Sequence, residues 1–95
     1  MSALIKAPVA FTFNCSTGST GAVAANAKRN YLLIINDSDT VVYLAFGEAA
    51  VANKGVRLNA NGGSYEMSER FGNLHQGAVN CINASGTKVL CGVEG

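Results

Sequence analysis

The chain has 95 residues and a net charge of +1, and 48% of its residues are hydrophobic while 14% are charged. This length supports one domain with a single modest core, and the apolar content excludes an intrinsically disordered chain. Basic residues are scattered along the sequence, whereas nucleic acid binding normally needs a clustered positive surface. No apolar run reaches membrane-spanning length. We therefore expect one globular domain that binds neither nucleic acid nor membranes.

Residues 1–28 differ from the rest of the chain and are expected to form an N-terminal arm, or a first strand plus a loop. The start lacks the charged region and long apolar core of a secretory signal, so we expect synthesis in a cytoplasm. Alternation of Val9, Phe11 and Phe13 predicts a strand, and the small residues after it predict a loop. Lys28 and Arg29 are interpreted as a solvated lead-in to the next strand. The partner-binding candidates in this segment are Leu4, Ile5, Pro8, Phe11 and Phe13.

The strongest pattern in the sequence lies between Asn30 and Gly47. Two runs rich in β-branched and aromatic residues flank Asn36–Asp39, whose side chains favour tight turns. This arrangement predicts a β-hairpin. Both runs are apolar at successive positions, so both faces of each strand are expected to be covered, by a second layer or by a neighbouring subunit.

Shorter strands follow to the end of the chain, separated by turn residues. The segments 55–59 and 64–67 flank Asn-Gly-Gly and predict a further hairpin, and a turn at Asn-Ala-Ser-Gly leads from 78–82 into the last strand, 87–93. About seven short strands at such intervals predict an all-β fold, a small antiparallel β-sandwich or jelly roll over residues 29–95 with an extended N-terminal arm. The expected core members are Leu33, Ile35, Val41, Tyr43, Leu58, Val79, Ile82, Val89 and Leu90.

Residues with catalytic or ligand-binding chemistry are few. The single histidine, His75, has no nucleophile or orienting group in a recognisable motif, and the cysteines Cys15, Cys81 and Cys91 lie in apolar strand contexts that disfavour thiolates. These cysteines form no CxxC pair, so we interpret them as buried and reduced, with a Cys81–Cys91 bridge as an alternative. Glycine motifs for phosphate and ligand spacings for metals are also missing. We expect no enzyme, no cofactor and no metal site.

Two thirds of the chain, residues 29–95, resembles a family of small virion structural proteins of tailed bacteriophages. The motifs that carry the resemblance are Arg29–Gly47, Gly55-Val-Arg-Leu58, Gly62-Gly-Ser-Tyr-Glu66, Gly77-Ala-Val79 and Val93-Glu-Gly95. The resemblance implies a β-sandwich that acts as a capsid decoration (cement) protein or as an accessory part of a head, neck or tail fibre. It also implies a homotrimer on the capsid surface, with the major capsid protein as partner and the N-terminal arm as a clamp.

The physics of the chain is compatible with that role, because a low charge density suits a surface that another protein covers. A ligand that binds only the assembled shell stabilises it by mass action and needs no catalysis. One alternative is an accessory head–tail, neck or fibre protein, such as a carbohydrate-binding sandwich on a tail fibre that uses Tyr65, His75 and Gln76. The other alternative is a small enzyme with His75 as base.

Overall fold

The computed structural model describes residues 8–95 and confirms an all-β fold of antiparallel strands. The eight strands are β1 (Val9–Cys15), β2 (Thr20–Val23), β3 (Tyr31–Asn36), β4 (Val42–Phe46), β5 (Val56–Leu58), β6 (Gly63–Ser68), β7 (Val79–Asn83) and β8 (Lys88–Glu94). The additional strand is β2, which lies in the segment predicted as a loop. Because β1 and β2 are members of the two sheets, residues 9–23 are part of the sandwich.

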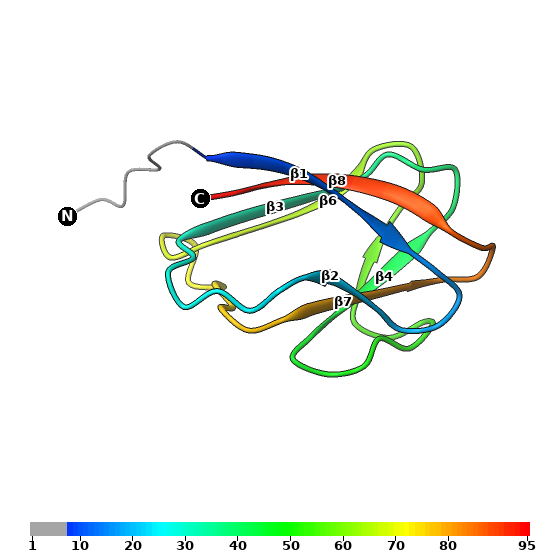
Figure 1. The fold of residues 1–95 in the computed structure, drawn as a ribbon, viewed down its shortest axis with the longest axis horizontal. Helices are drawn as coiled ribbons and strands as arrows, with labels where there is room; N and C mark the ends of the chain where they lie inside the picture. Colours follow the sequence, from blue (N-terminus) through cyan, green and yellow to red (C-terminus); the bar gives the residue numbers. More distant parts are fainter. Residues whose placement is uncertain (1–7) are drawn as a thin grey trace.

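The strands form two stacked sheets of four, in the order β1-β8-β3-β6 for the first sheet and β2-β7-β4-β5 for the second sheet (Figure 1). Pairing is nested: β1 pairs with β8, β2 with β7, β3 with β6, and β4 with β5. This order is that of a jelly roll, in which one long antiparallel ribbon is folded over a single core. The sandwich prediction is confirmed, and its jelly-roll alternative describes the topology.

The two predicted hairpins are wrong, although each turn, including the one before the last strand, is where the sequence places it. The strands flanking Asn36–Asp39 are β3 and β4, which belong to different sheets, and the same holds for β5–β6 and β7–β8. Buried asparagines explain two of these crossings. The Asn36 side-chain amide donates to the carbonyls of Thr40 (2.7 Å) and Leu58 (3.0 Å), and Asn83 donates to the Cys15 carbonyl (2.8 Å). Each amide thus ties the end of a strand to the opposite sheet.

The core lies between the sheets, and the structure corrects part of its predicted membership. Leu58, Val79 and Leu90 are buried as expected, whereas Val89 is 57% exposed. The expected core residues that are only half buried are Leu33, Ile35, Val41, Tyr43 and Ile82. The buried cluster contains Phe13, Cys15, Val23, Leu32, Ile34, Val42, Leu44, Leu58, Met67, Val79, Cys81 and Leu90. In β3 and β4 the side chains that point into the core are therefore those next to the predicted ones in the sequence. Alternation cannot identify the core face of a strand when both of its faces are apolar.

The buried side chain of Arg29 joins three parts of the chain, so its interpretation as a solvated residue is wrong. Its Nε donates to Glu94 in β8 at 2.7 Å, and its terminal nitrogens donate to the carbonyls of Ala24 (2.7 Å), His75 (2.6 Å) and Gly77 (3.1 Å). Arg29 is fully buried, and the Glu94 side chain is 25% exposed. A buried guanidinium is tolerated when its donors are satisfied, so the group is a structural clamp between two loops and the last strand.

Replacing this clamp is expected to destabilise the fold strongly. Arg29→Ala leaves Glu94 and three backbone carbonyls without their charged donor, and the expected loss is about 3–5 kcal/mol of unfolding free energy. Lys28→Ala, at the exposed neighbouring position, should change stability by less than about 0.5 kcal/mol. Urea unfolding of both variants measures the difference, and equal stabilities would contradict the role of Arg29.

Adjacent isoleucines in β3 test which face is the core. Ile34 is fully buried, and Ile35 is half buried on the opposite face. Ile34→Ala should cost about 2–5 kcal/mol because it leaves a cavity, whereas Ile35→Ala should cost about 1 kcal/mol. Denaturant unfolding of the two variants distinguishes the faces, and a larger cost at Ile35 would reverse the assignment.

Candidate functional site

The outer face of the first sheet, which points away from the second sheet, carries apolar side chains on its two central strands. We call Leu33 and Ile35 of β3 with Val89, Cys91 and Val93 of β8 the apolar face. In the antiparallel register Leu33 lies opposite Val93, and Ile35 lies opposite Cys91. Directly opposed residues of neighbouring strands project from the same side of a sheet, so the five side chains form one continuous surface. Four of them are half buried, and Val89 is 57% exposed.

Polar side chains border the apolar face on both sides. Thr12 and Asn14 of β1 lie opposite Cys91 and Val89, and on the other side β6 contributes Ser64 and Glu66. The hydroxyl of Tyr31 donates a hydrogen bond to Glu66, and this bond raises the pKa of the Tyr31 phenol. An apolar centre inside a polar rim is the usual anatomy of a protein–protein interface.

A shallow depression of about 540 Å³ lies over this surface. It is lined by Ala10, Phe11, Thr12, Ile35, Cys91, Gly92 and Val93. Gly92 has no side chain, and the ring of Phe11 occupies the space in which a methyl group at this position would lie. The lining is mostly apolar and has no ionisable group except the Cys91 thiol, so it suits apolar contact with a partner more than charged-ligand binding.

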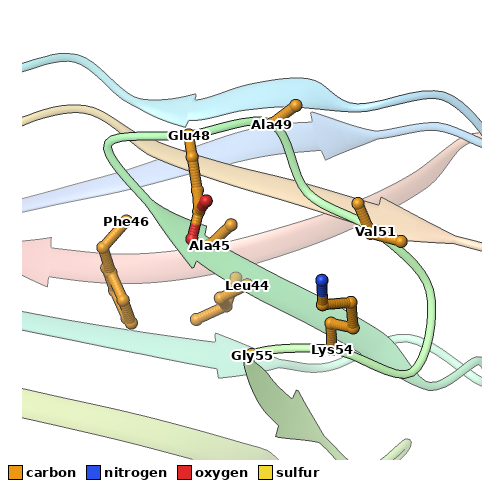
Figure 2. A pocket seen from close by; sticks show the side chains of 8 residues that line it. All are labelled: Leu44, Ala45, Phe46, Glu48, Ala49, Val51, Lys54 and Gly55. Carbon is orange, nitrogen blue, oxygen red and sulfur yellow. The ribbon is translucent and has the colours of Figure 1, made fainter.

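The outer face of the second sheet differs because the loop 47–55 folds across it. Ala50 is 4% exposed, its N–H donates to Ser19 Oγ (2.8 Å), and the Asn80 amide donates to the Glu48 carbonyl (2.6 Å). Between loop and sheet lies a pocket of about 170 Å³, in which Glu48 and Lys54 project over β4 (Figure 2). This volume is below the roughly 300–1,000 Å³ of small-molecule sites, so the pocket is a poor ligand site.

The five predicted partner-binding residues are distributed over different environments. Leu4 and Ile5 lie outside the described residues, and Pro8 is exposed at their beginning. Phe13 is buried at 9% exposure, and Phe11 is half buried and packs against the core. Their two rings stack at 6.1 Å between centroids, and the Phe11 ring fills the space above Gly92. The two phenylalanines therefore serve the core of this chain, and the structure does not gather the five residues into one surface.

The residues considered for catalysis or sugar binding have structural contacts instead. The rings of His75 and Tyr65 both pack on Phe46, at 5.6 Å between centroids, and His75 Nε2 is buried without a hydrogen-bond partner. The Gln76 amide donates to the carbonyls of Ala27 and Arg29. Tyr65, His75 and Gln76 thus do not form an exposed aromatic platform with free polar partners.

The cysteines are placed differently from the alternative of a Cys81–Cys91 bridge. Cys81 of β7 is fully buried between the sheets, whereas Cys91 lies on the apolar face, so the first sheet separates the two side chains. All three are free thiols. Within residues 8–95 no group of three or more His, Cys, Asp or Glu side chains could hold a metal ion. The same part of the chain contains no helix that is long and apolar enough to cross a membrane.

Sequence reasoning did not select the apolar face as a site, although its signal was present. The apolar character of both faces of residues 31–35 indicated a second covering layer, and Val89, Cys91 and Val93 alternate in the last strand. What the sequence lacked was the pairing of β3 with β8, which makes one surface from two distant segments.

Comparisons of the chain with protein-family models, curated proteins and solved structures give no match. The resemblance to small virion proteins therefore stays a prediction from the sequence. The candidate site is defined by the geometry of the first sheet alone, and its best-supported chemistry is the docking of another protein.

Proposed function

We propose that this chain is a non-enzymatic structural protein of a tailed-phage virion, in which it decorates and stabilises the capsid surface by docking onto the major capsid protein. The observation that carries the proposal is the apolar face, bordered by polar residues on the outer side of the first sheet. Folded proteins leave large continuous apolar surfaces uncovered mainly where something binds. A flat sheet face fits a protein surface better than it fits a small molecule.

The jelly-roll topology is compatible with a capsid role but does not single it out. Eight-stranded jelly rolls recur in viral capsid domains, and they recur also in lectins and in cupins. A fold shared by such different proteins does not identify a function, so the choice among them depends on the site. The contacts of Tyr65, His75 and Gln76 within the chain do not favour the lectin type of site.

The size of the face favours an oligomer. The whole outer face of the first sheet, which is the apolar face together with its polar border, spans four strands at about 4.8 Å spacing and about 20 Å in length, or roughly 400 Å². This is about half of what each partner buries in an interface of standard size. A single copy would therefore dock weakly, whereas a homotrimer that engages three sites gains affinity from the linkage. The proposal accordingly includes a trimer, and it leaves residues 1–7 as a further source of contact.

A charge placed on the apolar face is expected to abolish docking. Val89→Asp replaces a side chain that is already 57% exposed, so folding should be little affected while an apolar contact becomes an uncompensated charge. We expect at least tenfold weaker binding to heads assembled from the major capsid protein encoded in the same genome, measured by cosedimentation.

Ala49→Asp is the matched control, because it adds the same charge at an exposed position of the loop over the second sheet. It should bind like the unaltered protein. Equal loss in both variants would argue against the apolar face as the docking surface. Binding to isolated necks or tail fibres but not to heads would assign the protein to an accessory role elsewhere in the virion.

Native mass tests the oligomer separately. Light scattering in reducing buffer should give three times the 9.8 kDa of the chain. A monomer would remove the trimer from the proposal, and the docking experiment would then decide whether one copy binds by itself.

A further inference from the structure

Four strands lie at the edges of the two sheets: β1 and β6 in the first sheet, and β2 and β5 in the second sheet. An edge strand presents unpaired N–H and C=O groups to which another strand can bind, so proteins usually shorten, bend, charge or cover such edges. β5 has only three residues, with Arg57 in the middle. β2 has four, and its register with β7 shifts between Gly21 and Val23. Both edges of the second sheet are therefore poor templates for a further strand.

The β6 edge of the first sheet is covered by a side chain of the loop that follows it. The Asn73 amide nitrogen donates to the Glu66 carbonyl at 3.0 Å, and the Asn73 amide oxygen accepts the Ser68 N–H at 3.0 Å. In an antiparallel pair, every second residue turns both backbone groups toward the partner strand, and the residues between turn them away. Glu66 and Ser68 are two positions apart, so Asn73 satisfies groups that β6 turns away from β3.

The β1 edge has none of these devices among residues 8–95. The strand has seven residues, carries no charge and pairs with β8 without a register shift. Tyr31 of β3 and Gly95, the residue after β8, exchange both backbone hydrogen bonds at 3.0 Å, so the preceding residue, Glu94, turns its backbone groups toward β1. The partner of Glu94 in β1 is Val9. Counted from there in steps of two, the residues that turn both backbone groups to the open edge are Ala10, Thr12 and Asn14. Within residues 8–95 these groups have no hydrogen-bond partner.

The inward side of β1 is also incompletely covered near the start of the strand. Val9, Phe11, Phe13 and Cys15 share this side, because side chains alternate along a strand. Cys15 and Phe13 are buried, Phe11 is half buried, and Val9 is 63% exposed. The second sheet thus covers the end of β1 but not its beginning. Apolar side chains lie there beside the open backbone edge.

The open edge is continuous with the apolar face. Ala10 and Thr12 lie opposite Val93 and Cys91, and the shallow depression over the first sheet spans β1, β8 and β3. A strand added to β1 would extend this surface without a break. The outer face of the sheet by itself is about half the area that each partner buries in an interface of standard size. A partner that also engages the edge gains main-chain hydrogen bonds and further contact area.

We propose that β1 accepts an extended segment of the protein that covers the apolar face, and that this segment adds to the first sheet as a fifth strand. The inference rests on the proposed function, under which the segment belongs to the major capsid protein. Main-chain hydrogen bonds to Ala10, Thr12 and Asn14 supply affinity, and alternate side chains supply specificity. The segment carries apolar residues where it lies beside Val9 and Phe11, because a charge against these side chains would lose its hydration without a partner.

A proline at the centre of the open edge tests the proposal. Thr12→Pro removes one outward N–H and leaves the hydrogen bonds between β1 and β8 in place, and proline is tolerated on edge strands when the missing N–H faces solvent. Thr12→Val is the matched control, because it changes the same exposed side chain and keeps the N–H. In cosedimentation with heads assembled from the major capsid protein, we expect at least tenfold weaker binding for Thr12→Pro and unchanged binding for Thr12→Val. A cooperative thermal transition checks that both variants are folded.

Hydrogen exchange gives a second measurement on the unaltered protein. The outward amides of β1 should exchange rapidly in the free protein and become protected on the heads, because strand addition hydrogen-bonds them. Docking through the apolar face alone would leave these amides exchanging as before. Unchanged exchange in residues 9–15 on bound heads would therefore overturn strand addition.

The outcomes separate this inference from the proposed function. Binding that is lost in Val89→Asp but kept in Thr12→Pro would overturn strand addition and leave docking through the apolar face intact. Failure of the unaltered protein to bind heads would overturn both. A native mass that falls in Thr12→Pro, but not in Thr12→Val, would assign the edge to a second copy of this chain and overturn the capsid segment as its occupant.

Discussion

The arrangement of this small sandwich depends on one buried cation. Arg29 gives up its hydration and instead donates hydrogen bonds to Glu94 and to three backbone carbonyls in two loops. Removing a charge from water is costly unless such partners are in place, so the loops and the last strand must take up their positions together. Glu94 lies beside Leu32 in the register of β8 with β3. The clamp therefore fixes the alignment of the two strands that carry the apolar face.

Local patterns in the sequence identified the turns and all strands except β2, but not the partners of the strands. Asn36 and Asn83 stand at true reversals, yet their buried amides connect opposite sheets instead of closing hairpins. A turn has the same residue chemistry whether the chain returns within one sheet or crosses to the other. Likewise, nothing next to Arg29 in the sequence distinguishes it from Lys28, because its four partners are distant or are backbone atoms.

The same limit explains what was and was not predicted of the candidate site. The apolar character of both faces of β3 indicated that something covers each face, and one covering layer is the second sheet. The other face becomes a surface only when β8 lies beside β3, and this pairing joins residues that are far apart in the sequence. Alternation also could not state which isoleucine faces inward, since Ile34 and Ile35 are equivalent as a pattern.

The nested pairing has a consequence for synthesis on the ribosome. The innermost pair, β4 with β5, is complete before β6, β7 and β8 have been made, whereas β1 acquires its partner only when β8 has been made. Until then the inward side chains of β1, with Phe11 and Phe13 among them, have no sheet to join. Pairings that close over most of a chain are slow, and unpaired strand edges are prone to aggregate. Among the eight strands, β1 is therefore the first to be made and among the last to be fixed in place.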